Sequence, residues 1–399
     1  MSLNVKNKRA LTALTSAALA IPGMSASVQA ASVLTETVVQ YKASAYREAD
    51  LDSSKLSGGS LERYEIDTQQ VRAQLPLGEN TDASIEFMYE TMSGASPWFI
   101  LPGQDGPVQV MSGATIHEER KDLQAKINHL LNDKTVISFI GGVSDEKDYF
   151  AVNAGLEALY EIPDTQLTLP AGIGYSDDEL EPNDGRILPD RIVRATRDST
   201  TAFVGLSQIL SKTTVVQASL SYSLQRGFLS DPYKKVWIDD QANTINDSRP
   251  DDRNQFVAQL RLRHFLPELK AAVHLDYRYF EDDWEVASST MEAAWYQNLP
   301  GGWVFTPSLR YYSQTQAFFY APYFFSARGD GFGSADYRLS PYGAISVKLR
   351  LEKRWQSLDL HAEWESYEAS ADYSLDSVDL ENPGLVEFDI LSVGLNWRL

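Results

Sequence analysis

Three kinds of residue pattern are absent or scarce in this chain of 399 residues. It has no cysteine, which excludes disulfide bonds, a thiol nucleophile and thiolate metal sites. Only 35 Lys and Arg residues stand against 55 Asp and Glu residues, and this imbalance argues against a nucleic-acid partner, which needs clustered basic groups. After residue 30, no apolar run approaches the roughly 20 residues of a membrane-spanning helix.

The first 30 residues have the composition of a secretory signal peptide. Lys6, Lys8 and Arg9 give a positive start, and a mostly apolar segment follows up to Met24. Small residues around Ala30 supply a cleavage site. The apolar segment, of about 15 residues, is short for a membrane anchor. We therefore predict a cleaved signal peptide over 1–30 and one domain over 31–399.

A period of two runs through most of the remaining chain. Ala83, Ile85, Phe87 and Tyr89, for example, alternate with mostly polar residues. Such alternation gives a strand one apolar and one polar face. About fifteen runs of this kind lie between 61 and 399, so the sequence predicts an all-β protein.

The gaps between these runs distinguish a soluble β-protein from a transmembrane barrel. Short and long gaps mostly alternate, as the short turns and long loops of outer-membrane barrels do. One further run, Val39 to Ala45, makes the number of strands even. The sequence thus predicts a transmembrane antiparallel β-barrel of about 16 strands, with about 14 to 18 as the range. The long gaps are 93–118, 176–198, 227–252, 316–339 and 369–384.

Aromatic residues support this interpretation. Trp and Tyr concentrate at membrane interfaces because one end of each side chain is apolar and the other is polar. Ordinary packing in a β-sandwich is the alternative. The tryptophans near predicted strand ends are Trp284, Trp303, Trp355, Trp364 and Trp397.

If the apolar phase faces lipid, several charged and polar residues face the lumen. Opposed basic and acidic walls in a water-filled channel would select solutes by charge. The alternative is a set of paired charges that only fills the lumen or fixes the rim. The candidates are Arg261, Arg263, Arg278, Arg310, Tyr312, Gln314, Lys348, Arg350, Asp359, Glu363 and Glu365.

The gap at 93–118 contains a short repeat, in which Ser-Gly-Ala occurs at 93–95 and again at 112–114. The apolar segment between the two copies is unusual for a solvated loop. We predict that it folds into the barrel and narrows or plugs it, and a clasp packed against the rim is the alternative. The candidates are Ser93, Gly94, Ser96, Trp98, Ser112, Gly113, Thr115 and Arg120.

The loops rich in Asp and Glu raise the question of a metal site. The densest cluster, around Asp177 to Asp184, could bind divalent cations, but its spacing does not match an EF-hand and a solvated acidic loop is the simpler interpretation. His361 shares its strand face with Asp359 and Glu363, yet no hydrolase, zinc-protease or nucleotide-binding motif is present. We expect no enzyme activity, cofactor or bound metal.

Three motifs carry a family resemblance. They are the Ser-Gly-Ala pair followed by Arg120, the segment Tyr-Arg-Tyr-Phe-Glu-Asp-Asp-Trp at 277–284, and Arg-Tyr-Tyr-Ser-Gln at 310–314. With them the chain resembles a bacterial family of predicted outer-membrane β-barrels with a domain of unknown function. The resemblance implies a fold and a location in the outer membrane, but no substrate.

The sequence therefore favours a porin-like channel for small polar solutes or ions. A barrel that serves as a docking or assembly platform in the cell envelope is the alternative. The expected surroundings are outer-membrane lipid and lipopolysaccharide, with no nucleic acid. A homo-oligomer and a periplasmic partner are left open.

Overall fold

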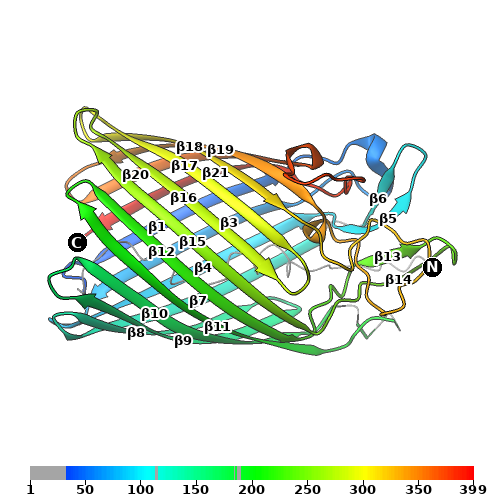
Figure 1. Ribbon diagram of the computed structural model, residues 1–399, viewed down its shortest axis with the longest axis horizontal. Helices are drawn as coiled ribbons and strands as arrows, with labels where there is room; N and C mark the ends of the chain where they lie inside the picture. The colour runs from blue at the N-terminus through cyan, green and yellow to red at the C-terminus, as the bar shows by residue number, and fades with distance from the viewer. Residues whose placement is uncertain (1–32, 113–115, 184, 187–189) are drawn as a thin grey trace.

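The computed structural model describes residues 33–112, 116–183, 185–186 and 190–399. In these residues, sixteen strands form one closed antiparallel barrel (Figure 1). The prediction of an all-β antiparallel barrel is confirmed, and so is the strand number. The predicted signal peptide lies outside the described residues.

The sixteen barrel strands are connected in chain order, each to the next around the wall. In the described residues, eight further segments lie in the loops: the strands β2 (Leu56–Gly58), β5 (Pro97–Pro102), β6 (Pro107–Met111), β13 (Lys235–Ile238) and β14 (Asn243–Asn246), and the short helices η1 (Ser53–Lys55), η2 (Tyr337–Leu339) and η3 (Ala371–Tyr373). The barrel strands are β1 (Val38–Glu48), β3 (Glu65–Pro76), β4 (Thr81–Gly94), β7 (Ile116–Asn132), β8 (Thr135–Asp145), β9 (Tyr149–Ile162), β10 (Leu167–Leu180), β11 (Ala195–Ser211), β12 (Thr214–Gly227), β15 (Asp252–Leu266), β16 (Ala271–Asp282), β17 (Ala287–Leu299), β18 (Trp303–Gln314), β19 (Tyr342–Arg354), β20 (Leu358–Ser370) and β21 (Glu387–Arg398).

The first and last barrel strands close the wall. β1 pairs with β3 on one side and with β21 on the other, and Val39 lies opposite Trp397 in the register. The backbone N–H of Leu399 donates to the carbonyl of Thr37 at 2.9 Å, which extends the same ladder. No strand of the closed wall is therefore left with an unpaired edge.

The outward face of the wall is apolar. Large apolar side chains recur at every second position and stay exposed, as Ile173 (54%) and Leu260 (50%) do. The side chains of the opposite phase point inward. The two short helices other than η2 are η1 (Ser53–Lys55) and η3 (Ala371–Tyr373), and in the described part of the chain no helix is long and apolar enough to span a bilayer.

The two ends of the barrel differ. At one end the strands join through short turns such as 133–134 and 212–213, and the last residue lies at this end (Figure 1). At the other end lie the long loops 49–64, 228–251, 315–341 and 371–386, with β5, β6, β13 and β14 among them (Figure 1). We call these the short-turn end and the long-loop end. Their alternation along the chain follows the predicted pattern.

Two sequence predictions need correction. The loop predicted over 176–198 is shorter than expected. β10 continues to Leu180, and β11 already begins at Ala195. The ion pair between Asp178 and Arg197, at 2.6 Å, stabilises this extension, so the densest acidic cluster lies partly on a strand. Trp284 is not at an outer interface but is only 3% exposed, and it packs edge-on against Phe319 at the long-loop end.

Candidate functional site

The lumen is lined by the polar phase of the strands. Arg261 and Arg263 on β15 alternate with the exposed Leu260, and Lys348 and Arg350 on β19 alternate with exposed leucine and valine side chains. All six predicted basic residues belong to neighbouring strands, from β15 to β19. We call them the basic wall: Arg261, Arg263, Arg278, Arg310, Lys348 and Arg350.

Most of the basic wall is paired with carboxylates on the strand next to it. Arg263 donates to both oxygens of Asp276, at 2.7 and 2.9 Å, and Arg261 lies 3.7 Å from the same carboxylate. Arg310 donates to Glu292 at 2.9 Å. Two arginines therefore share one aspartate, which leaves a positive excess at β15.

The predicted acidic residues do not form a wall opposite the basic one. In the register, Lys348 lies beside Glu365 and Arg350 beside Glu363, with ion-pair distances of 3.0 and 3.7 Å. β20 is next to β19 in the ring, so these carboxylates lie beside Lys348 and Arg350 and neutralise their charges. Asp359 lies at the short-turn end, where Arg398 donates to both of its oxygens at 2.7 and 2.9 Å.

Arg278 differs from its neighbours. Among the described residues, no carboxylate lies within ion-pair distance of its guanidinium, which instead sits 5.5 Å from the ring centroid of Phe280. Tyr312 packs against Tyr342 with ring centroids 5.6 Å apart. Gln314 is buried and donates to the carbonyls of Ser340 and Arg338, at 2.6 and 3.0 Å, so it anchors a loop and does not line the lumen.

An acidic region lies halfway around the ring from Arg278. Arg278 is on β16, and one carboxylate of the region, Glu90, is on β4, which is eight strands away in either direction. Arg120, predicted as part of the constriction loop, is instead on β7 with 1% exposure. It donates to Ser144 at 3.0 Å and lies 3.6 Å from both Asp122 and Glu146. Glu90 is its register partner on β4. Asp122 and Glu90 lie on β7 and β4, whereas Glu146 lies in the loop between β8 and β9, so nothing in the local sequence pattern groups them.

The segment predicted to constrict the lumen forms a hairpin at the long-loop end (Figure 1). Strand β6 is the centre of a three-stranded sheet and pairs with β5 on one side and with β2 on the other. Ser96 and Ser112 close the base of the hairpin through two hydrogen bonds of 2.9 Å. Ser93 and Gly94 end β4, and Trp98 lies on β5. Gly113 and Thr115 lie outside the described residues.

Gly94 shows why this segment needs small residues. Its φ of +121° lies in a region that L side chains rarely adopt. A Cβ atom there would also lie 2.1 Å from the carbonyl oxygen of Arg63. The first Ser-Gly-Ala copy therefore allows the chain to leave β4 sharply, directly against the segment that precedes β3.

Five loops interlock at the long-loop end, and we call this assembly the cap: 49–64, 95–112, 228–251, 315–341 and 371–386. Ile100 of the hairpin packs with Val236, Ile238 and Ala335 from two other loops. Asn382 donates to Tyr320 at 2.9 Å and to the carbonyl of Ala335 at 3.2 Å. The cap thus has an apolar core and polar cross-links of its own.

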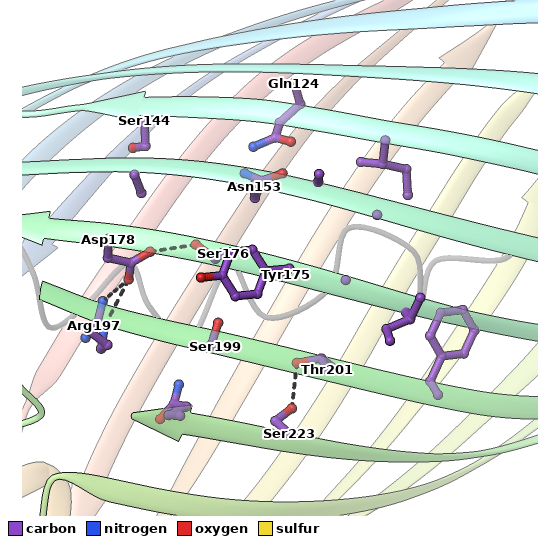
Figure 2. A pocket seen from close by; sticks show the side chains of 18 of the residues that line it. Gln124, Ser144, Asn153, Tyr175, Ser176, Asp178, Arg197, Ser199, Thr201 and Ser223 are labelled. Atoms are coloured by element: carbon purple, nitrogen blue, oxygen red, sulfur yellow. Dashed lines mark hydrogen bonds and ion pairs between the residues drawn. The ribbon is translucent and has the colours of Figure 1, made fainter. Parts of the chain in front are cut away.

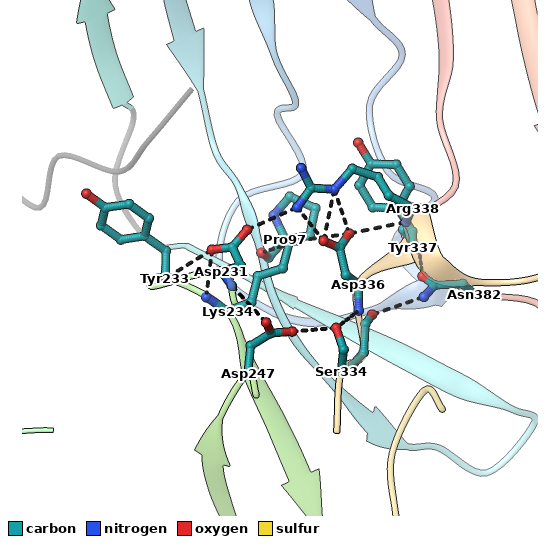
Figure 3. Close-up of polar contacts among 12 residues, drawn as sticks. Pro97, Asp231, Tyr233, Lys234, Asp247, Ser334, Asp336, Tyr337, Arg338 and Asn382 are labelled. Atoms are coloured by element: carbon teal, nitrogen blue, oxygen red, sulfur yellow. Dashed lines mark hydrogen bonds and ion pairs between the residues drawn. The ribbon is translucent and has the colours of Figure 1, made fainter. Parts of the chain in front are cut away.

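Asp336 is the centre of the cap (Figure 3). Its carboxylate is fully buried and accepts hydrogen bonds from Arg338 and Arg249, with Lys234 at 3.9 Å. Burial disfavours the ionised form, but the charges of Arg338, Lys234 and Arg249 outweigh it and hold the pKa of Asp336 well below its usual value. Asp231 and Asp247 balance the remaining positive charge through Arg338 and Arg249.

A second part of the lumen was missed at the sequence level. A cavity of about 200 Å³ lies against the inner face of β8 to β12 (Figure 2). Short polar side chains and glycines in the inward phase of these strands were the available signal, but they carry no charge and form no motif. Among the described residues, no group of three or more His, Asp or Glu side chains is arranged to hold a metal ion.

The comparisons with known proteins concern family and architecture. The model of a family described as a protein of unknown function, DUF3570, matches residues 11–387. No curated protein sequence matches the chain. Among solved structures, OmpT of Vibrio cholerae aligns with a TM-score of 0.44 and 10% identity, over 91% of this chain and 97% of that one.

Two further solved structures are similar at the same level. OccK3 from Pseudomonas aeruginosa aligns with a TM-score of 0.42 and 12% identity, over 91% of this chain and 95% of that one. The siderophore receptor PirA from the same organism aligns with a TM-score of 0.43 and 8% identity, over 83% of this chain and 56% of that one. The chain spans about half the length of this receptor, and the likeness is one of barrel architecture.

Proposed function

The chain belongs to the DUF3570 family, whose function is unknown, and we propose that it forms a channel for small polar solutes or ions in the bacterial outer membrane. The contrast between the two faces of one wall carries the proposal. The outward phase is apolar and exposed, while the inward phase of the same strands carries Arg, Lys, Asp and Glu. Lipid solvates the first face, and water is needed to solvate the second.

The two charged regions of the lumen give such a channel a means of selection. The basic wall has an excess of positive charge at Arg261, Arg263 and Arg278, and the carboxylates around Arg120 lie halfway around the ring. A transverse field between them would orient dipolar solutes and act differently on anions and cations.

The cap would control entry at the long-loop end. The hairpin of β5 and β6 contacts β2 and β13, so its position depends on the other cap loops. We therefore propose that the constriction is formed by the cap as a unit and not by segment 93–118 alone.

Conductance tests this function directly. The purified barrel, reconstituted in planar bilayers, should give discrete current steps, and a salt gradient should give a reversal potential that reports its charge preference. A folded, heat-modifiable barrel that never conducts would overturn the channel.

The ordered cap favours one alternative, a barrel that serves as a docking platform. The buried charges around Asp336 hold the loops in one arrangement, as a recognition surface requires. If both the native protein and a variant with a loosened cap fold but stay silent in bilayers, the platform becomes the better proposal.

A further inference from the structure

The cavity on the inner face of β8 to β12 suggests the class of solute. Building on the channel proposed above, we infer that this face binds neutral, hydroxyl-rich solutes of the saccharide class. Side chains that both donate and accept hydrogen bonds line much of it, beside apolar side chains such as Ile140 and Phe203 (Figure 2). The hydroxyl and amide side chains on β8 to β12 are Ser144, Asn153, Ser176, Ser199, Thr201, Ser223 and Gln225, and the neighbouring strands β7 and β15 add Gln124 and Gln255.

Glycines create the space for this recess. A Cβ atom on Gly172 would lie 2.5 Å from a ring carbon of Phe203, so the ring can pack against β10 only because position 172 has no side chain. In the same way, the amide of Gln124 lies over Gly142, where a Cβ atom would be 2.1 Å from its oxygen. The basic wall carries long charged side chains instead.

Of the charged side chains in the lining, Asp178, Arg197 and Glu157 are compensated, whereas Asp122 shares the cation Arg120 with Glu146. Asp178 accepts from Arg197 at 2.6 and 2.9 Å and from Ser176 at 2.5 Å. Glu157 accepts from Lys126 at 2.5 Å. A charged solute would find no spare counter-ion at these pairs, and it would have to lose hydration to reach them. A neutral solute avoids this cost.

The hydroxyl groups retain hydrogen-bonding capacity after pairing with each other. Thr201 and Ser223 lie 2.7 Å apart across β11 and β12, and one hydrogen bond uses only part of what two hydroxyls offer. The remaining donors and acceptors match the alternating donors and acceptors around the edge of a sugar ring. A site of this kind discriminates strongly against solutes that lack the hydroxyl.

Phe203 supplies an apolar surface in the middle of the polar ones. Its ring lies beside Gly172, and the exposed fraction of its side chain is intermediate. The faces of a sugar ring carry C–H groups while its edge carries hydroxyls, so an aromatic ring flanked by hydroxyls and amides fits both parts. A cavity of about 200 Å³ has room for about one sugar ring, and the other rings of a longer saccharide would lie in the lumen beside it.

The test uses single-channel current with maltotriose as the neutral probe and sulfate as the charged one. Maltotriose should lower the current in a saturable way. Thr201→Val keeps the shape of the side chain but removes its hydroxyl, and it should raise the half-blocking concentration about fivefold, the cost of about one hydrogen bond. Thr290→Val, on the inner phase of β17, is the matched control and should leave the block unchanged.

The outcomes separate this inference from the channel itself. A conducting pore that maltotriose does not affect, or that sulfate blocks instead, overturns the inference and leaves the channel standing. An equal rise of the half-blocking concentration in Thr201→Val and Thr290→Val also overturns the inference and leaves the channel standing. If the protein does not conduct, the channel fails, and titration calorimetry with maltotriose in detergent decides the inference: binding weakened by Thr201→Val supports it, and no binding overturns it.

Discussion

Arg249 and Asp336 lie 2.9 Å apart, although 87 residues separate them in the chain. The contact joins loop 228–251 to loop 315–341 and is buried beneath the rest of the cap. Since Asp336 also holds Arg338 and Lys234, one carboxylate stabilises three cations from two loops.

Removing that carboxylate should loosen the cap. Asp336→Asn leaves buried cations without their counter-charge, and breaking a buried pair in this way costs about 3–5 kcal/mol. We expect faster hydrogen exchange and proteolysis in 228–251 and 315–341, with the barrel intact. Asp330→Asn is the control, because Asp330 lies in the same loop with an exposed partner, Arg328. If these two loops exchange hydrogen and are cleaved at equal rates in both variants, Asp336 does not hold the cap together.

Glu146 should make one rim of the barrel sensitive to pH. It lies in the loop between β8 and β9, where burial raises its pKa to about 8, opposed by Arg120 and assisted by the carboxylates of Asp148, Glu90 and Glu118. The folded state therefore binds this proton more tightly than the unfolded state. The stability that it contributes is complete below a pH of about 4.5 and is lost as the pH rises to about 8.

Hydrogen-exchange protection factors of the β8–β9 hairpin should therefore fall between pH 6 and pH 9. Glu146→Gln should remove most of this dependence, because the amide cannot ionise. Asp145→Asn, at the exposed neighbouring position, should not. A native profile that is flat across this range would show that Glu146 does not titrate there.

Arg278 should influence ion preference. A unit charge at about 10 Å in water contributes about 0.4 kcal/mol, which corresponds to about a twofold change in permeability ratio. Arg278→Gln should shift the reversal potential towards cation preference by this amount. Lys353→Gln makes the same change in charge, but Lys353 lies over the rings of Trp303 and Trp355 on the outward phase, so its reversal potential should stay native. Identical shifts of the reversal potential in the two variants would show that the position of Arg278 in the lumen does not matter.

Shortening the cap hairpin should increase conductance. Replacing 98–110 with a short linker removes most of β5 and β6 but keeps Ser96 and Ser112 at the hairpin base. Deletion of the turn 103–106 alone is the control, since it leaves Ile100 and its contacts in place. Conductance that is unchanged by the larger deletion would indicate a purely structural clasp.

The sequence predicted the wall well because every strand meets the same two environments. An apolar residue such as Leu260 marks the outward face of a strand, and a charged residue such as Arg261 marks the inward face. The face of each residue can therefore be assigned from the alternation alone, without any long-range contact. The extension of β10 and β11 was missed because Asp177 and Asp178 look like loop residues. Only pairing with Arg197 on the neighbouring strand makes Asp178 favourable there.

The cap could not be predicted in this way. Asp336, Lys234 and Arg249 each look like solvated loop residues, and only the meeting of their loops buries them. The partners of the basic wall were missed for a related reason. The acidic residues Glu363 and Glu365 were assigned to the correct face, but the register decides whether they oppose Lys348 and Arg350 or neutralise them.

The pairing of β1 with β21 makes closure of the wall depend on a contact between segments far apart in the chain. Val39 lies opposite Trp397 only when β21 is in place, so the wall has two open edges until β21 joins it. The ion pair between Lys55 and Glu381 at 2.8 Å also links the first cap loop to the last. A barrel without β21 would therefore expose the edges of β1 and β20, and both edges could pair with strands of other molecules.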